Sequence, residues 1–327
     1  ANAVISAGLA YGSSLLSAAL TKKPKAQGGT LIDVQFAADV YRSIPFGRVA
    51  LGGRRIYWKG VGKKNGRICI VDALGDWACE GLVAVWVNGV RKTLNPITVV
   101  GTEDARYEVE DYDDKFVVKF FSGTMGQSAD SELITLSADT DGGSIGAWTS
   151  DHRGAGVCYV SYILEYDDDL MPSEPRLLWE LDGALLYDWR LDSTNGGTGS
   201  HRWDDPTTWE CSANSAVASY NYRRGFFRNG LRLGGIGVPS YDLLHDAYTT
   251  AANICDETVS DGGGNRDRYV VSFISNDDAE HRVAIDTFNG AMAGDDIERG
   301  GQFGVLAGAA YSPVMTLTDD DMIEGES

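Results

Sequence analysis

Residues 270–321, VVSFISNDDAEHRVAIDTFNGAMAGDDIERGGQFGVLAGAAYSPVMTLTDDD, decide the fold of this chain. Apolar residues alternate over residues 269–273, and this period of two predicts a strand. Two strand-like runs follow further on, one after the glycine pair at 300–301 and one after Pro313. A helix is expected between the first strand and these two runs. It would begin after the cap-like Asn276, and apolar residues recur in it at helical spacing at Ala284, Phe288, Ala291 and Met292. The stretch therefore predicts a strand, a helix and a strand pair, and it contains no grouping of nucleophile, base and metal ligand.

The composition favours a mainly β chain. The 327 residues include 40 glycines and only 8 prolines, and together with abundant β-branched and aromatic residues this is typical of strands joined by tight turns. The length is enough to bury a sizeable core and suggests two or three domains. The expected fold class is mainly β with minor α, an α+β fold.

The charge balance is strongly acidic. The chain carries 47 acidic and 28 basic residues, a formal net charge of −19. This argues against a protein that grips nucleic acid, because phosphate binding needs clustered lysine and arginine. It suits either a solvated acidic surface or the wall of a channel that must not hold DNA.

The cysteines indicate neither a disulfide framework nor a zinc site. They are odd in number and widely spaced, and they form no CxxC pair. Reduced thiols in a protein made in a cytoplasm are the default expectation. The five positions are Cys69, Cys79, Cys158, Cys211 and Cys255.

An apolar, small-residue segment occupies residues 1–28. No basic residue precedes its apolar run at residues 1–20, whereas Lys22, Lys23 and Lys25 follow it, so a secretory signal is not indicated. The run is long enough to reach across a bilayer, but its serines and glycines make it weakly hydrophobic. We expect a packed or lumen-facing helix, with membrane contact as the alternative.

The first half of the chain reads as strands and turns. Residues 32–97 contain short strands between glycine turns, and Asn65-Gly66 and Asn88-Gly89 supply the residues of tight hairpin turns. Longer apolar strands are expected at 156–164 and 176–188. The pattern is typical of a β-barrel or a β-sandwich.

The second half mixes an irregular segment with helices. Residues 192–238 are rich in Gly, Ser, Asn and Arg and predict a long irregular loop, which is usually functional or interface-forming. The glycine run at 261–264 is interpreted as the C-cap turn of the preceding helix. That helix begins after Pro239 and carries its apolar face on Leu244, Ala247, Ala251, Ile254 and Cys255.

No histidine or acidic cluster has the spacing of a metal site. None of the histidines stands in an HxxxH spacing, and none of the acidic clusters alternates its acids as a D-x-D-x-D-G calcium loop does, although Asp139-Thr-Asp141-Gly142 comes nearer. We interpret the histidines as surface or packing residues and the clusters as solvated turns. The histidines are His152, His201, His245 and His281, and the clusters are 111–114, 167–169, 295–296 and 319–321.

Catalytic motifs are also missing. Asp261-Gly-Gly-Gly lacks the GK[ST] of a phosphate cradle, and no GxSxG elbow is present. A dispersed Ser/His/Asp triad and a glycosidase pair of carboxylates stay open, because their members need not be adjacent in sequence. We predict no catalytic, cofactor-binding or metal residue, no cofactor, and no enzyme activity.

Several short structural stretches follow one another over most of the chain. They are the apolar start, Ile44-Pro-Phe-Gly-Arg, Arg54-Arg-Ile-Tyr-Trp, Ser122-Gly-Thr-Met-Gly-Gln, Trp148 to Val160, Pro175-Arg-Leu-Leu-Trp-Glu-Leu-Asp-Gly, Leu186-Tyr-Asp-Trp-Arg, Tyr241 to Val259, and residues 270–321 with the closing Thr316-Leu-Thr-Asp-Asp-Asp-Met-Ile. In this order they resemble the central tail-hub proteins of long-tailed bacteriophages, the tip attachment protein J group and the related large baseplate protein of gene transfer agents. Because each stretch is short, their order carries the resemblance.

The resemblance implies a homotrimeric hub at the virion tail tip, made in the host cytoplasm. Each chain would contribute two tube-like β-barrels, so that a three-fold tip meets a six-fold tail tube around a channel for the tape measure protein and then DNA. The implied partners are the distal tail protein, the tail tube and tail-tip or receptor-binding proteins, and DNA would pass without specific binding. The implied domains are a first hub barrel at 29–105 and 166–191, an inserted β domain at 106–165, and part of a second hub domain at 239–327.

The sequence departs from the family in ways that keep alternatives open. Family members commonly continue into fibronectin-like modules and a receptor-binding end, so host recognition by this chain alone is not implied. The loop at 192–238 replaces a more regular family segment, with Trp203, Trp209 and residues 220–227 as its expected anchors. The alternatives are a receptor- or glycan-binding module that uses this loop and, on the abundance of carboxylates alone, a cell-wall-degrading tip enzyme.

Overall fold

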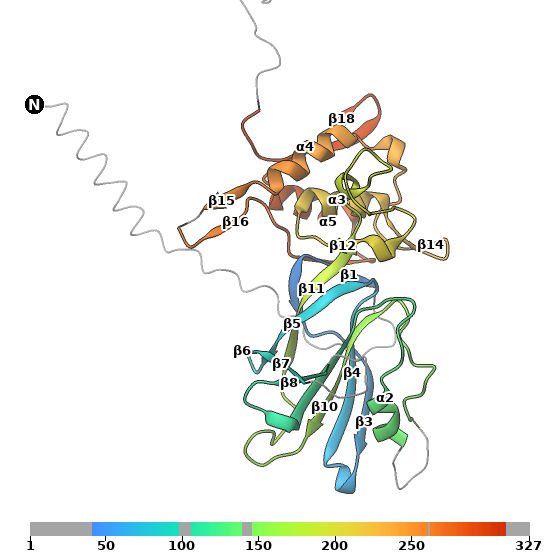
Figure 1. Ribbon diagram of the computed structural model, residues 1–327, viewed down its shortest axis with the longest axis vertical. Helices are drawn as coiled ribbons and strands as arrows, with labels where there is room; N and C mark the ends of the chain where they lie inside the picture. Colours follow the sequence, from blue (N-terminus) through green and yellow to red (C-terminus); the bar gives the residue numbers. More distant parts are fainter. Residues whose placement is uncertain (1–40, 98–105, 139–145, 261, 312–327) are drawn as a thin grey trace, which may run out of the picture. The chain divides into compact units, whose positions relative to one another are not determined.

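The computed structural model in Figure 1 describes residues 41–97, 106–138, 146–260 and 262–311. All of these residues belong to one compact unit, Val34–Ser327. The expectations for residues 1–28, including membrane contact, lie outside the described residues, as do those for residues 139–142 and for the runs after Pro313. No helix within the described residues is long and apolar enough to span a membrane.

A six-stranded antiparallel sheet is the larger β element, and β10 (Cys158–Glu165) lies in its interior. This strand pairs with β4 (Arg67–Gly75) on one side and β9 (Phe116–Phe121) on the other. The outer strands are β3 (Arg54–Val61) beside β4, and β8 (Arg106–Val109) followed by β7 (Leu94–Ile97) beside β9. Of the strands in the region 106–165, expected as an inserted domain, β10 therefore pairs directly with β4, and β9 and β8 follow it in the same sheet.

A second antiparallel sheet has β11 (Leu177–Leu186) between β12 (Glu210–Cys211) and β5 (Cys79–Val87), and β5 continues to β6 (Val90–Lys92). Strand β2 (Arg48–Leu51) also pairs with β11. Alternate residues in the first half of β11 and along β10 enter one apolar core between the two sheets, which explains the period-two pattern of these segments. These residues are Leu177, Trp179 and Leu181 in β11 and Val160, Tyr162 and Leu164 in β10.

The two sheets form a sandwich and not a closed barrel. In the described residues the larger sheet ends at β3 and at β7, and neither of these strands forms a ladder with the second sheet. The expectation of a tube-like barrel is corrected in this respect, because alternating strands with glycine turns are common to both architectures.

The expected hairpin turns are confirmed. Between β3 and β4 the turn η1 (Lys63–Asn65) has positive φ at Lys64 and Asn65, 58° and 55°, one residue earlier than the dipeptide Asn65-Gly66 suggests. Between β5 and β6 the values are 50° at Asn88 and 86° at Gly89. Asparagine and glycine adopt this left-handed backbone most readily, so both hairpins are fixed locally.

Helix α2 (Ser131–Ala138) covers the outer face of the larger sheet, and the sequence pattern did not predict it. Asp130 caps it, since its Oδ1 accepts hydrogen bonds from the backbone N–H groups of Glu132 (2.9 Å) and Leu133 (3.2 Å). The same oxygen lies 3.0 Å from Nζ of Lys119, which is buried in β9. An ion pair therefore fastens the helix to the sheet.

Three helices form a second packing region: α3 (Ser215–Arg224), α4 (His245–Cys255) and α5 (His281–Ala291), with α3 in contact with both others (Figure 1). The prediction that residues 192–238 are irregular is wrong at α3. Its residues 215–223 are all buried, and a helix buried on every side has no apolar stripe to reveal it. Asn214 caps α3 by accepting from the N–H groups of Ala216 and Val217.

The opening stretch of the sequence is confirmed only in part. The strand expected at 269–273 lies instead at residues 273–276, because residues 269–272 form no ladder and Val270 makes only an isolated bridge with Asn214. Asn276 therefore ends a strand, and the N-cap of the helix is Glu280. Helix α5 follows β17 (Phe273–Asn276), and the glycine pair at 300–301, with φ of 62° and 82°, joins β18 (Asp295–Arg299) to β19 (Gln302–Leu306). Strand β17 pairs with β1 (Ser43–Phe46), far away in sequence. The expected order of helix, strand, helix and strand is observed from α4 onward.

One expected helix boundary is wrong. Helix α4 ends at Cys255, and β15 (Thr258–Ser260) follows at once, so the glycine run at 261–264 is no helix cap. Gly262, with φ of 85°, lies between β15 and β16 (Asn265–Asp267) in a hairpin. The remaining hairpin, β13 (Phe226–Arg228) with β14 (Leu231–Gly234), follows α3 directly.

Candidate functional site

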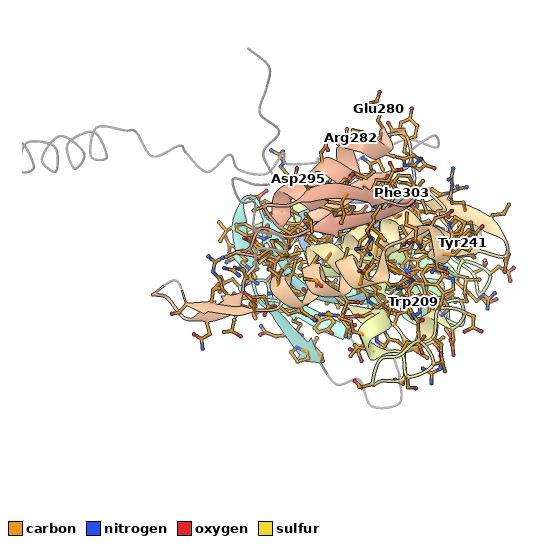
Figure 2. All side chains as sticks on the ribbon, turned by 90° about the horizontal axis from the view of Figure 1, so that it is seen from above. Trp209, Tyr241, Glu280, Arg282, Asp295 and Phe303 are labelled. Carbon is orange, nitrogen blue, oxygen red and sulfur yellow. The ribbon has the colours of Figure 1, made fainter. Side chains whose placement is uncertain are left out.

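An aromatic cluster forms where β11 runs into the helical region. Tyr187 and Trp189 follow the last residue of β11, and the ring centroid of Trp189 lies 4.3 Å from that of Tyr220 in α3. Trp203 lies 5.4 Å from Tyr187 and 5.4 Å from Trp209, again between ring centroids. Tyr220 is fully buried and Trp209, labelled in Figure 2, is 6% exposed. The irregular segment before α3 is thus fixed to the helices by its aromatic side chains, although Phe227, another expected anchor, is exposed.

A cavity of about 320 Å³ lies beside this cluster, and we call it the Arg224 pocket. It is within the size range, from about 300 Å³ upward, of pockets that hold small molecules. Its walls come from the end of α3, the start of α4 and the loop after β11. The residues that matter most are Asp192, Asn195, Trp203, Tyr220, Arg224 and His245.

Arg224 is held at the pocket by aromatic side chains. Its guanidinium carbon lies 3.9 Å from the ring centroid of Trp203, and its Nη1 donates a hydrogen bond of 3.2 Å to the Tyr220 hydroxyl. Among the described residues no carboxylate oxygen forms an ion pair with Arg224. The preceding residue differs, because Arg223 is buried and its Nη2 lies 2.5 Å from Oδ1 of Asp296. The pocket therefore contains a positioned cation without an internal counter-ion.

Asp192, in the wall of the pocket, is already fully engaged. Its Oδ1 accepts from the N–H and hydroxyl of Thr194 (2.8 and 2.7 Å) and from Arg202 (3.0 Å), and its Oδ2 accepts from the Tyr187 hydroxyl (2.7 Å). The hydrogen bonds from Thr194 are the main reason why the pKa of Asp192 falls to about 2. The carboxylate is ionised at neutral pH and shapes the loop instead of exchanging protons.

His245 adds a neutral ring to the pocket. Burial, and after it the nearby positive charge of Arg224, lowers the pKa of His245 below its ordinary value. Its Nε2 lies 3.5 Å from the Tyr220 hydroxyl. At neutral pH the pocket thus presents an uncharged imidazole beside Arg224, while its other cation, Arg202, is paired with Asp192.

Comparisons with known proteins show a weak likeness to a solved structure. No protein-family model matches the chain, and no curated protein matches it. A chain of a solved structure, the virion of a native gene transfer agent particle, is similar to it. The TM-score is 0.42 and the identity 17%, over 98% of this chain and 68% of that chain. A likeness at this level carries no argument about function.

A second cavity, of about 480 Å³, surrounds Arg190, but its charges are compensated internally. The guanidinium lies 2.6 Å from Oδ2 of Asp188 and 2.8 Å from Oδ2 of Asp256. His201 lines the same cavity and is 2% exposed; its Nδ1 accepts from the N–H of Asp188 at 3.1 Å. The proton of its neutral ring is therefore on Nε2, which has no hydrogen-bond partner among the described residues.

The four histidines and the acidic clusters do not converge. His152 stacks on Trp148 in the loop before β10, and Nδ1 of His281 lies 2.9 Å from the Tyr222 hydroxyl. No group of three or more His, Cys, Asp or Glu residues in the described part of the chain is placed to hold a metal ion. The clusters at 111–114 and 167–169 lie in turns, and residues 295–296 lie in β18, where Asp296 pairs with Arg223 as described.

A buried polar cluster inside the sandwich was not foreseen from sequence. Asp72 is completely buried, and its Oδ1 and Oδ2 accept from Nε of Arg55 (2.9 Å) and from the Tyr162 hydroxyl (2.7 Å). Burial, and then the charge of Asp72, raises the pKa of Tyr162 well above its usual value. Each group has a partner, so the cluster is a structural one, joining β3, β4 and β10.

Proposed function

We propose that the chain is a structural hub protein at the distal tip of a long-tailed phage tail, where three copies join a six-fold tail tube to a three-fold tip. The observation that carries this proposal is the position of the stretches that resemble tail-hub proteins. Five of them lie on helices and strands of the unit or lead into one: residues 44–48 in and after β1, 54–58 in β3, 153–160 leading into β10, 175–183 in β11, and 241–259 across α4.

The pairing of these elements explains why short structural stretches can carry a resemblance. Strand β1 pairs with β17 and contacts β11 and β4, while β10 pairs with β4. These elements therefore fix the positions of one another through backbone ladders and buried side chains. A resemblance on these elements supports a shared architecture and not a shared ligand.

The charge of the chain fits the proposed role. With a net charge of −19, a channel lined by copies of this protein would repel the phosphates of passing DNA and would not retain them. We propose the distal tail protein, the tail tube, the tape measure protein and tail-tip proteins as partners. On this proposal the chain has no enzymatic activity of its own.

Copy number tests the hub role. Purified tails of the source particle, analysed by quantitative mass spectrometry, should contain three copies of this chain per tail against the known six-fold repeat of the tube. Light scattering of the purified chain should also give three times its mass of 35.2 kDa. Six copies or one copy per tail tip would contradict the symmetry-adapter function.

The second candidate function is a receptor- or glycan-binding tail-tip module. One specific observation favours it, namely the Arg224 pocket in the segment with the aromatic anchors. Binding of intact host cells by the isolated chain would favour this function over a purely structural one, and a lack of binding would count against it.

A further inference from the structure

We propose that the Arg224 pocket binds a sugar that carries a carboxylate. The first reason is the unused cation. In a chain with 47 acidic residues, Arg224 has no carboxylate partner among the described residues, although Arg223 beside it and Arg202 across the pocket both have one. A guanidinium stacked on an aromatic ring keeps the N–H groups at its edge available, and these match a carboxylate in a two-point contact.

The second reason is the way in which Arg224 is fixed. Trp203 lies against the guanidinium, Tyr220 accepts from Nη1, and Trp203 is itself packed against Tyr187 and Trp209. The rotamers of a free arginine therefore do not have to be ordered when a ligand arrives, which lowers the entropic cost of binding. Such pre-organisation is expected of a binding residue more than of a solvated surface cation.

The third reason is that the pocket is too large and too varied for a simple anion. Its volume of about 320 Å³ exceeds the share of a water molecule, about 30 Å³, by an order of magnitude. Asn195 and Ser240 supply neutral donors and acceptors, and the exposed Asp204 supplies an acceptor that opposes a second negative charge. A ligand with one carboxylate, several hydroxyl groups and an apolar ring face suits these walls.

The neighbourhood of the pocket is open to a ligand. Tyr241, which follows the pocket residue Ser240, is 74% exposed and is labelled away from the centre of the view in Figure 2. Arg224 itself is partly exposed. A sugar at the end of a longer chain could therefore enter the pocket while the rest of that chain stays in solvent.

The inference does not depend on the hub function, because it concerns the isolated chain and a copy number of three neither supports nor opposes it. The test is calorimetric titration of the full chain with glucuronate, galacturonate and N-acetylneuraminate, and with glucose and acetate as comparison ligands. At least one acidic sugar should bind saturably, while glucose and acetate should bind at least tenfold more weakly.

Two matched variants make the test specific to the pocket. Arg224→Gln and Lys64→Gln each remove one positive charge, but Lys64 lies in the exposed turn between β3 and β4. Arg224→Gln should weaken binding roughly tenfold to a hundredfold, the range for a lost hydrogen-bonded charge. Lys64→Gln should leave affinity within about twofold, since a distant exposed charge is screened.

A third variant separates charge from geometry and protects against a folding defect. Arg224→Lys keeps the charge but loses the planar fork, so it should retain the near-ultraviolet circular dichroism spectrum and still bind several-fold more weakly. The proposal is overturned if none of the three acidic sugars binds, or if Arg224→Gln binds as the unchanged protein does. Binding of acetate as tightly as the sugars would overturn the sugar assignment and leave a general carboxylate site.

Discussion

Replacing Phe46 by alanine should destabilise the protein by about 4–5 kcal/mol, because Phe46 links the first described strand to the helices. The side chain is completely buried. Its ring centroid lies 5.1 Å from that of Phe288, 5.8 Å from Phe226 and 6.4 Å from Tyr222, all edge-to-face. Truncation of a buried Phe costs about 3–5 kcal/mol including the cavity, and aromatic pairs add roughly 0.5–1.5 kcal/mol each. We therefore place the loss in the upper half of that range.

Urea unfolding followed by intrinsic fluorescence measures this loss as a fall in the midpoint at constant slope. The matched control is Phe227→Ala, the same change at a residue that is 45% exposed, and it should cost no more than about 1 kcal/mol. Hydrogen exchange should show the largest loss of protection in α3 and α5, which carry Tyr222 and Phe288. Equal losses for the two variants, or a loss of protection confined to the sandwich, would refute the assignment of Phe46 to the helical core.

Three further outcomes test local contacts. The pKa of Asp192 is about 2 in the folded protein and about 3.9 in an unfolded chain. Its contribution to stability is therefore complete above about pH 4 and is lost as the pH falls towards 2. In Asp192→Asn the urea midpoint should fall less steeply over this pH window, and an unchanged pH profile would contradict this. Desolvation raises the pKa of three thiols, two of them buried and Cys211 partly buried, so in the native protein all three should react slowly with a disulfide reagent at pH 8 and faster in urea. Fast native reaction of Cys69 or Cys255 would contradict their burial. The thiols are Cys69 and Cys211, with a pKa of about 12, and Cys255, with a pKa of about 11. Asp130→Ala removes both the cap of α2 and the nearer of the two described counter-ions of the buried Lys119 ammonium, so it should cost about 3 kcal/mol in urea unfolding. Asp130→Asn keeps a capping oxygen and should cost less; equal losses would assign the whole effect to charge.

Local sequence signals were sufficient where one face of an element meets solvent. Helices α4 and α5 bury one side only, so their apolar residues recur at helical spacing and could be read directly. The turn between β5 and β6 was equally readable, because Asn88 and Gly89 favour the positive φ that the hairpin needs. These elements are determined by neighbours in sequence.

Local signals failed where an element is surrounded or where distant segments meet. Helix α3 is buried on all sides and includes Ser219, Asn221 and Arg223, so its composition resembles that of a loop. Asn221 is satisfied inside the core, where its Oδ1 accepts from the N–H of Tyr187 and its Nδ2 donates to the Tyr187 carbonyl. Only the tertiary structure supplies such partners, and for this reason polarity alone misled the prediction.

The same limit applies to the Arg224 pocket. Trp203 could be singled out from sequence as an anchor of its segment, but nothing local indicates that Arg224 would lie over it or that His245 from another helix would join them. The signal that could have been used is the excess of arginine in a segment of an otherwise acidic chain. That excess is informative only when the ion-pair partners of each arginine are known.

Strand β11 explains why the sandwich and the helices behave as one unit. Trp179 and Leu181 belong to the sandwich core, while Ala184 and Leu186, further along the same strand, belong to the helical core. Between them lies Gly183, whose N–H donates to the Gly47 carbonyl at 2.9 Å, and a Cβ added there would come within 2.4 Å of the Pro45 carbonyl oxygen. The turn after β1 therefore rests directly on the backbone of β11. Strand β1 also pairs with β17. A domain boundary drawn at residue 191 would therefore separate these two paired strands, and each of the two parts of the chain would expose apolar surface that the other part now covers.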